Sequence, residues 1–262
     1  MSVELTELEE RFRAYVDGFL GNGEESDYHI DLKLRHSLRV YELAREIAER
    51  DNLPALVTRL GLMAALFHDT GRFPQYAQFQ SFHDPSTANH ARLGVTALLH
   101  SDLLHDLTLA ERRTVLGAVF LHNVRDLPCP LHEPLASVVR LVRDCDKLDI
   151  IPIMLDHLDP NQPHNKVVTL GVAPDPSRYT LAILDAVRER RMASYQDMRW
   201  YHDFRLLTLG WFYDLNYPGA TTIFAERGYA GRIFSELPVD SATTCLRAQM
   251  EMDMAHKAQK RS

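Results

Sequence analysis

Hydrophobic residues recur every three to four positions along most of this chain, and this spacing predicts helices with one buried face. Residues 3–20 follow the pattern, and the glycine-containing segment 21–23 ends it. The pattern returns in residues 32–50, and the segment 52–54 separates this second helix from a third one that runs to His68. We therefore expect three successive helices in the N-terminal part of the chain.

The rest of the chain continues the helical periodicity, with interruptions rich in proline. Segment 70–85 is expected to be a loop or short helix that packs down through its aromatic residues, and segment 166–170 a small strand or hairpin arm. No internal repeat is visible. Because the helical periodicity covers most of the chain, the pattern predicts an all-α fold. Further helices are expected at about residues 86–104 with Ser86 as N-cap, 109–122, 135 to Asp146, 178–191, 197–215, 218–227 and 240–258.

Composition narrows the class of protein. The chain has 262 residues, 45% of them hydrophobic and 25% charged, which is typical of a soluble globular protein. The net charge of −7 and the pI near 6.0 argue against a broad nucleic-acid-binding surface. There is no apolar run of the roughly 20 residues that span a bilayer and no signal-peptide pattern at the acidic N-terminus. The three separated cysteines read as reduced thiols, so we expect a cytoplasmic protein.

The adjacent residues His68 and Asp69 stand at the end of the apolar run Ala65-Leu66-Phe67. Such a pair can supply two ligands to one metal ion, and the aspartate can reach a second ion through its other oxygen. A buried carboxylate needs a partner, and a metal ion is a natural one. Imidazole and carboxylate together suit divalent iron, manganese, cobalt, nickel and zinc. Water bound to such an ion becomes a nucleophile near neutral pH.

Two further candidate ligands each have a simpler explanation. His36 lies on the apolar face of its helix, where a lone histidine is usually a hydrogen-bonded core residue. Asp146 is expected near the end of a helix whose arginines, Arg140 and Arg143, face solvent. Its carboxylate could then pair with Arg143 or Lys147 instead of a metal ion.

The order and contexts of these residues resemble the HD superfamily of metal-dependent phosphohydrolases. The resemblance covers about residues 30–155, and the layout of the whole chain is similar to a group of uncharacterised bacterial HD hydrolases. The residues that carry it are His36 followed by Ser-Leu-Arg-Val, His68-Asp69 followed by Thr-Gly-Arg, and Asp146 within Arg-Asp-Cys-Asp-Lys-Leu-Asp.

The resemblance implies a helical bundle of the HD type with a C-terminal helical extension. Residues 1–262 would form a single domain, in which the extension at about 175–262 packs on a metal-binding core at about 30–155. The resemblance also implies a first metal ion held by four residues: His36, His68, Asp69 and Asp146.

His90 and His122 resemble the extra ligands of dinuclear HD proteins, such as cyclic-nucleotide phosphodiesterases and di-iron oxygenases. With these ligands, Asp69 would bridge two ions. Alternatively, the two histidines line a pocket over one ion and position a substrate phosphate. We therefore expect one or two divalent transition-metal ions per chain.

Four neighbouring residues are expected to support the site. Arg72 occupies a position where many relatives carry lysine, and it could bind a substrate phosphate and stabilise negative charge in the transition state. The alternative is a salt bridge to a nearby acid. Arg39 and His83 could reach the same pocket and bind substrate, and Asp149 could hold a ligand histidine by a hydrogen bond.

The function implied by the resemblance is hydrolysis of a phosphoester by metal-activated water, with Asp69 and Arg72 as catalytic residues. The partner would be a small phosphorylated molecule, such as a nucleotide or cyclic nucleotide, and neither a nucleic acid polymer nor a membrane. The C-terminal helices could form a homodimer surface. No Gly-Tyr-Pro follows the His-Asp pair, which argues against the HD-GYP cyclic-di-GMP phosphodiesterases. The alternatives are a di-iron oxygenase and a non-catalytic nucleotide-binding module.

Overall fold

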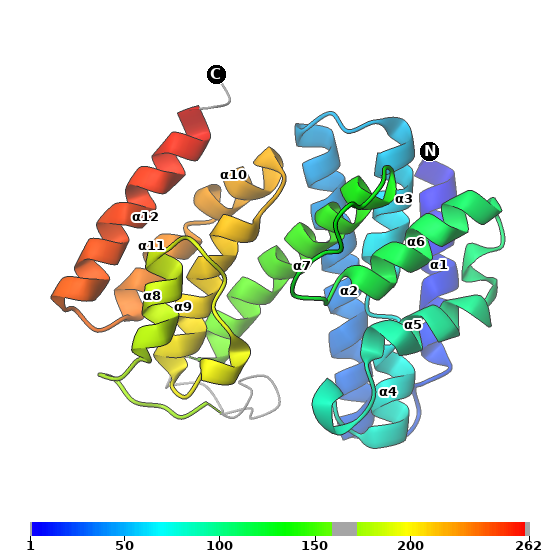
Figure 1. Cartoon of the computed structure of the whole chain (residues 1–262). Coiled ribbons are helices and arrows are strands. Elements are labelled where there is room, and N and C mark those ends of the chain that lie inside the picture. Colours follow the sequence, from blue (N-terminus) through cyan, green and yellow to red (C-terminus); the bar gives the residue numbers. More distant parts are fainter. Residues whose placement is uncertain (1, 159–171, 260–262) are drawn as a thin grey trace. The chain divides into compact units, whose positions relative to one another are not determined.

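The computed structural model describes residues 2–158 and 172–259, and the regular structure in them is helical (Figure 1). The one β interaction among these residues is an isolated bridge between Ala173 and Trp200. The expected all-α fold is therefore confirmed. The short strand predicted at residues 166–170 lies outside the described residues.

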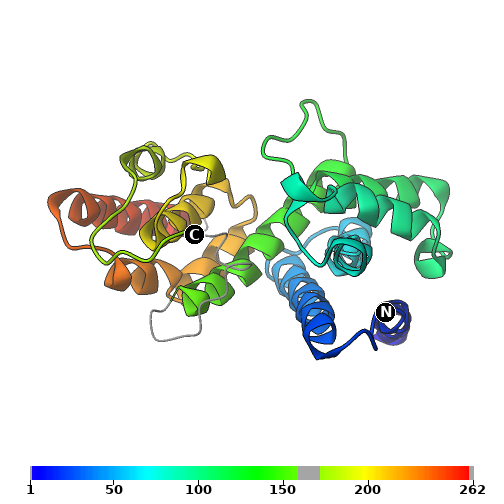
Figure 2. The same cartoon turned by 90° about the horizontal axis from the view of Figure 1, so that it is seen from below.

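The chain divides into two compact units, residues 1–146 and residues 147–262. The division falls inside one helix, α7 (Leu135–His157), which both views show as an unbroken green ribbon (Figures 1 and 2). The expectation of a single domain, with the C-terminal helices packed on the metal-binding core, stays a prediction.

Helices α1 to α6 and the first part of α7 build the first unit. They span Ser2–Asp17 (α1), Glu24–Arg50 (α2), Ala55–Phe67 (α3), Arg72–Phe79 (α4), His90–Leu99 (α5) and Leu109–Leu121 (α6). Helix α3 contacts both α2 and α6, and all its residues from Leu60 to Phe67 are buried. A helix that is apolar on all sides belongs in a core, so the His-Asp pair that follows α3 emerges inside the unit.

Several helix boundaries differ from the predicted ones for identifiable reasons. Helix α2 begins at Glu24, because three acidic residues in its first turn complement the helix dipole. Ser86 is not an N-cap, since it lies in a short 3₁₀ turn; α5 starts after Asn89, whose side chain accepts a hydrogen bond from the Arg92 N–H. Helix α7 continues beyond Asp146 to His157, so this aspartate is not near the helix end.

The segment after the His-Asp pair packs onto the first unit through aromatic rings, as expected. Phe73 of α4 contacts Phe12 and Phe19 of the N-terminal segment, with ring centroids 5.9 Å apart in each pair. Phe12 also meets Phe67 of α3 at 5.5 Å. These contacts fix α4, and with it Arg72, beside the C-terminal end of α3.

In its described residues, the second unit contains the end of α7 and five further α-helices. They are α8 (Leu181–Arg188), α9 (Tyr201–Trp211), α10 (Pro218–Glu226), α11 (Tyr229–Glu236) and α12 (Ser241–Gln259). All residues of α9 are buried, and the aromatic side chains Trp211, Phe212 and Phe224 belong to the core. Helix α11 was not predicted, because glycines at 228 and 231 weaken its sequence pattern. No helix in the described ranges is long and apolar enough to cross a bilayer.

Candidate metal centre

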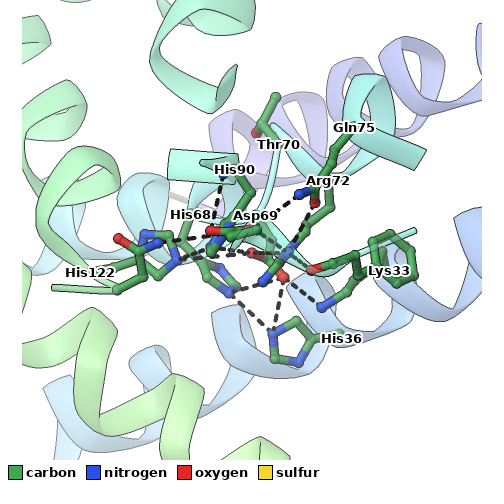
Figure 3. A network of polar contacts seen from close by, with 12 residues as sticks. Lys33, His36, His68, Asp69, Thr70, Arg72, Gln75, His90 and His122 are labelled. Carbon is green, nitrogen blue, oxygen red and sulfur yellow. Dashed lines mark hydrogen bonds and ion pairs between the residues drawn. The ribbon is translucent and has the colours of Figure 1, made fainter. Parts of the chain in front are cut away.

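The first unit brings all six predicted ligands to one place. His36 lies in the middle of α2, Asp146 in α7, and His90 is the first residue of α5. His68 and His122 are the C-terminal caps of α3 and α6, and Asp69 follows His68. Figure 3 shows the side chains of His36, His68, Asp69, His90 and His122 converging from these separate elements. The four histidines and Asp69 are buried.

The Asp69 carboxylate lies between two pairs of histidines. Its Oδ2 atom is 3.6 Å from Nε2 of His36 and 3.9 Å from Nε2 of His68. Its Oδ1 atom is 3.4 Å from Nε2 of His90 and 3.9 Å from Nε2 of His122. Each oxygen therefore faces a different group of potential ligands, as a carboxylate that bridges two ions must do.

Asp146 completes the first of these groups. Its Oδ1 atom is 3.2 Å from Nε2 of His36 and 3.7 Å from Nε2 of His68. The alternative pairing with Arg143 or Lys147 does not occur. Arg143 is buried, contrary to the expectation that it faces solvent, and donates hydrogen bonds to backbone carbonyls. Lys147 pairs with Asp214, 2.7 Å away.

The hydrogen bonds on the other side of each ring set the direction of the histidine lone pairs. Nδ1 of His68 donates to the Ala65 carbonyl at 2.8 Å, and Nδ1 of His122 donates to the Val119 carbonyl at 2.7 Å. A carbonyl oxygen can only accept, so Nδ1 carries the proton in both rings. With this tautomer, the Nε2 lone pair of a neutral ring points into the cluster, as a metal ligand needs.

His90 is held in the same tautomer by a carboxylate. Its Nδ1 atom lies 2.6 Å from Oδ2 of Asp84, while its Nε2 atom lies 3.0 Å from Nε2 of His122. Burial and Arg72 lower the pKa of His90 in spite of Asp84, and burial together with His90 and His68 lowers the pKa of His122 to about 3. At neutral pH, two unprotonated nitrogens thus face each other, an arrangement that a cation between them would stabilise.

The donor spacing fits a divalent metal ion. For metal–nitrogen bonds of about 2.1 Å, neighbouring ligands of an octahedral ion lie about 3.0 Å apart and opposite ligands about 4.2 Å apart. The Nε2 atoms are 3.1 Å apart in the pair His36–His68 and 3.0 Å apart in the pair His90–His122. All the distances from these nitrogens to Asp69 and Asp146 fall between the two limits. The side chains therefore form two adjacent candidate sites that share Asp69.

Two cations balance the charge of Asp69. Nζ of Lys33 is 2.9 Å from Oδ2, and Nε of Arg72 is 3.4 Å from Oδ1. Burial alone would raise the pKa of Asp69, but Lys33, followed by His68, Arg72 and His90, holds it well below its usual value. Asp69 is therefore ionised at neutral pH, as a metal ligand must be.

Arg72 also has a second task, which the sequence did not indicate. Its Nη1 atom donates to Oε1 of Gln75 at 2.9 Å, to the Phe82 carbonyl at 2.7 Å and to Oδ1 of Asp84 at 3.0 Å. Gln75 donates to the same Asp84 oxygen at 2.9 Å. Arg72 thus pairs with nearby acids, as one of its two predicted readings stated, and it helps to hold the carboxylate that orients His90.

Asp84 and Lys33 were missed in the sequence, although each had an indication. Lys33 lies three residues before His36, so both side chains lie on one face of α2. Asp84 follows His83, the residue that the sequence analysis predicts to bind substrate. His83 is exposed, and its Nδ1 atom lies 2.9 Å from Oγ of Ser86. The structure therefore places Asp84, and not His83, against the ligands.

The positions of the two remaining predicted residues do not test their predicted roles. Arg39 is exposed on α2. Asp149 is buried in α7, in the part of the helix that belongs to the second unit. The substrate-binding role of Arg39 and the supporting role of Asp149 stay predictions.

Comparison with known proteins supports the family. Residues 34–151, which include all six candidate ligands, match the family model described as the HD domain. Residues 34–151 therefore form an HD domain, and the resemblance seen in the sequence is confirmed. Searches of curated proteins and of solved structures gave no significant match.

Proposed function

We propose that this protein is a metal-dependent phosphohydrolase that cleaves a phosphoester with metal-activated water. The observation that supports the proposal most directly is the position of Asp69, whose two oxygens face two separate pairs of histidine Nε2 atoms. Two adjacent ions on a shared carboxylate are a common arrangement in enzymes that displace an oxygen from phosphorus.

Each proposed ion has its own set of ligands. One ion would be held by His36, His68, Asp146 and Oδ2 of Asp69, and the other by His90, His122 and Oδ1 of Asp69. When bound, the ions would supply a water nucleophile at neutral pH and positive charge for the phosphoryl oxygens. Iron, manganese, cobalt, nickel and zinc all suit this mixture of imidazole and carboxylate.

The side chains around the ligands would bind and orient the phosphate. Arg72 keeps its proposed catalytic role through Nη2, which donates to no residue in the described part of the chain, whereas Nη1 is fully engaged. Arg39 lies one turn from His36 and would contact the substrate beyond the phosphate. The proposed substrate is a small phosphorylated molecule, and a nucleotide or cyclic nucleotide is the class to test first.

The test combines metal analysis with hydrolysis assays. Protein purified without chelator should contain about two metal ions per chain, and it should release phosphate from nucleoside monophosphates or open cyclic nucleotides. Asp69→Ala should remove both metal and hydrolysis, whereas Asp31→Ala, a change on α2 at a side chain that is 43% exposed, should preserve both. An Asp69→Ala protein that keeps metal and activity would rule out the proposal.

The same ligand set gives a second candidate function. Six imidazole and carboxylate ligands around a bridging aspartate would also hold two iron ions for oxygen-dependent cleavage of a C–C or C–P bond. Oxygen consumption by the iron-loaded protein, without phosphate release from any phosphoester, would favour this oxygenase. A ligand-induced rise in melting temperature without turnover of any kind would instead favour a non-catalytic nucleotide-binding module.

A further inference from the structure

Lys33 is the cation nearest to Asp69, and its side chain lies at the accessible edge of the metal centre. The histidine side chains are at most 6% exposed, whereas Lys33 is 20% exposed and Asp146 is 22% exposed. A molecule that approaches the ligands from solvent therefore meets Lys33 before it meets the histidines. Figure 3 shows Lys33 directed from α2 toward Asp69.

Not all N–H donors of the Lys33 ammonium are used by partners within the described residues. In the described part of the chain, its one polar partner is Oδ2 of Asp69 at 2.9 Å, and its other neighbour is the Phe82 ring, with the centroid at 5.3 Å. An ammonium group has three N–H donors. Lys33 can therefore hold Asp69 and still donate to an anion bound beside it.

Arg72 differs from Lys33 in this respect. It also lies near the Phe82 ring, at 5.9 Å, but its Nη1 atom is tied to Gln75, Asp84 and a backbone carbonyl. The guanidinium is therefore fixed in place, whereas the lysine stem is flexible and its head can follow a ligand. Of the two cations, Lys33 is the one that can adjust to an incoming group.

The charge of the centre decides which ligand class it accepts. The named groups comprise three carboxylates, on Asp69, Asp84 and Asp146, and two cations, on Lys33 and Arg72, so they carry a net negative charge. Two divalent ions would make the centre strongly positive, because bound cations dominate a local site. The loaded centre therefore attracts an anion with more than one negative charge, and a terminal phosphate group is such an anion.

We propose that Lys33 binds a non-bridging oxygen of the terminal phosphate of a phosphomonoester while it remains paired with Asp69. This proposal rests on the proposed function of the same site and specifies its substrate class. The ions would hold the phosphate from the histidine side, and Lys33 would hold it from the solvent side. Phe82, in contact with both cations, forms the apolar wall beside it.

The competing explanation is that Lys33 serves only to neutralise Asp69. In that case its removal would change metal binding, because the Asp69 carboxylate would lose its nearest cation. Metal content and phosphate affinity must therefore be measured separately on the same variants.

Inorganic phosphate is the probe that separates these explanations, because it binds without turnover. The full-length protein is loaded with manganese, its metal content is determined, and phosphate is titrated by calorimetry. The variants are Lys33→Gln, Lys33→Arg as the conservative change, and Arg35→Gln as a matched control. Arg35 lies on the same helix, is 70% exposed and pairs with Asp31.

We expect Lys33→Gln to keep its metal and to bind phosphate at least tenfold more weakly, since a charge-assisted hydrogen bond is worth about 1.5–3 kcal/mol. Lys33→Arg should stay within about threefold of the wild type, and Arg35→Gln should match it. For a phosphomonoester substrate, KM should rise in Lys33→Gln, and a phosphodiester should be less affected because it carries one negative charge.

Three results would overturn the proposal. They are unchanged phosphate affinity in Lys33→Gln, loss of metal in Lys33→Gln that accounts for its weaker binding, and absence of phosphate binding by the loaded wild type. Failure of the proposed function would look different: the loaded protein would bind phosphate through Lys33 but hydrolyse no phosphoester. If the wild type hydrolysed a phosphoester and Lys33→Gln bound phosphate as tightly as the wild type, only the proposed role of Lys33 would be wrong.

Discussion

Nδ1 of His90 lies 2.6 Å from Oδ2 of Asp84, and this contact fixes the ring so that Nε2 faces Oδ1 of Asp69. Burial disfavours the charge on Asp84, but its hydrogen bond to His90 and the charge of Arg72 lower its pKa to about 2. A ligand histidine oriented by a carboxylate is a recurring device in metal proteins. Here the carboxylate is itself held by residues of α4.

Asp84→Ala should therefore weaken the second candidate metal site more than the first. Loss of such a supporting carboxylate typically costs about 10- to 100-fold in metal affinity. Metal content after dialysis should fall from about two ions per chain to about one. Asp31→Ala, at a partly exposed position on α2, serves as the control. Equal loss of both ions, or of neither, would contradict this role.

Gly71 is a second point at which the structure requires one particular residue. A Cβ atom there would lie 2.0 Å from the His90 carbonyl oxygen and 2.4 Å from the Gly94 nitrogen, which are both backbone atoms. Gly71→Ala should lower the free energy of unfolding by about 1–3 kcal/mol or more, because the backbone must move. Denaturant unfolding, with metal content measured in parallel, tests this expectation.

Gly231 provides the matched control for that change. It lies inside α11, and a Cβ atom there would have no neighbour within 4 Å. Gly231→Ala should raise the free energy of unfolding by about 0.5–1 kcal/mol, because alanine is the better helix former. If both alanine variants were destabilised alike, close packing at Gly71 would not be the cause.

Arg143 joins the helix of one ligand to the loop that follows another. Its guanidinium donates to the carbonyls of His122 at 3.3 Å and Arg125 at 3.1 Å, and also to that of Val124. Arg143→Gln should cost about 1–3 kcal/mol of stability, since three carbonyls, including that of buried His122, would lose their partner. Arg140→Gln, exposed on the same helix, should change stability little. Thermal unfolding of both variants tests the difference.

The raised pKa of Tyr15 predicts how the free energy of unfolding responds to alkaline pH. Burial raises its pKa from 10.0 to about 12. The folded state then keeps the proton more tightly than the unfolded state, so this contribution to stability is complete below pH 10 and is lost as pH rises toward 12. Tyr15→Phe should flatten the decline in this window. Denaturant unfolding at several alkaline pH values would show it, and parallel curves for both proteins would refute it.

The ligands could be predicted from the sequence because each stands in a recognisable context. His68 and Asp69 follow a helix whose residues from Leu60 to Phe67 are all apolar, and the spacing of the others repeats a known family pattern. Lys33 and Asp84 had no such pattern. Their roles depend on how α2 and the segment after α4 meet Asp69 and His90 in space. Tertiary neighbours of this kind are not encoded in the spacing along one helix.

Some predicted helix boundaries were wrong for a related reason. The sequence analysis expected Ser86 as the cap, but Asn89 is of an equally suitable residue type, and local rules do not choose between the two. The choice follows from Asp84, which must lie where it can reach His90 and Arg72. Arg143 was placed on the solvent side because arginine usually is, yet the loop after His122 needed donors for its carbonyls.

Because α7 runs unbroken through the boundary between the two units, the chain should resist proteolysis at that boundary. Asp146 is the last residue of one unit and Lys147 the first of the next, yet no loop separates them. Proteases need an extended, locally unfolded segment and cleave helices poorly. A partial digest should therefore not release the two units at their boundary. A fragment designed to carry the HD domain alone should extend to His157, so that the helix bearing Asp146 stays whole.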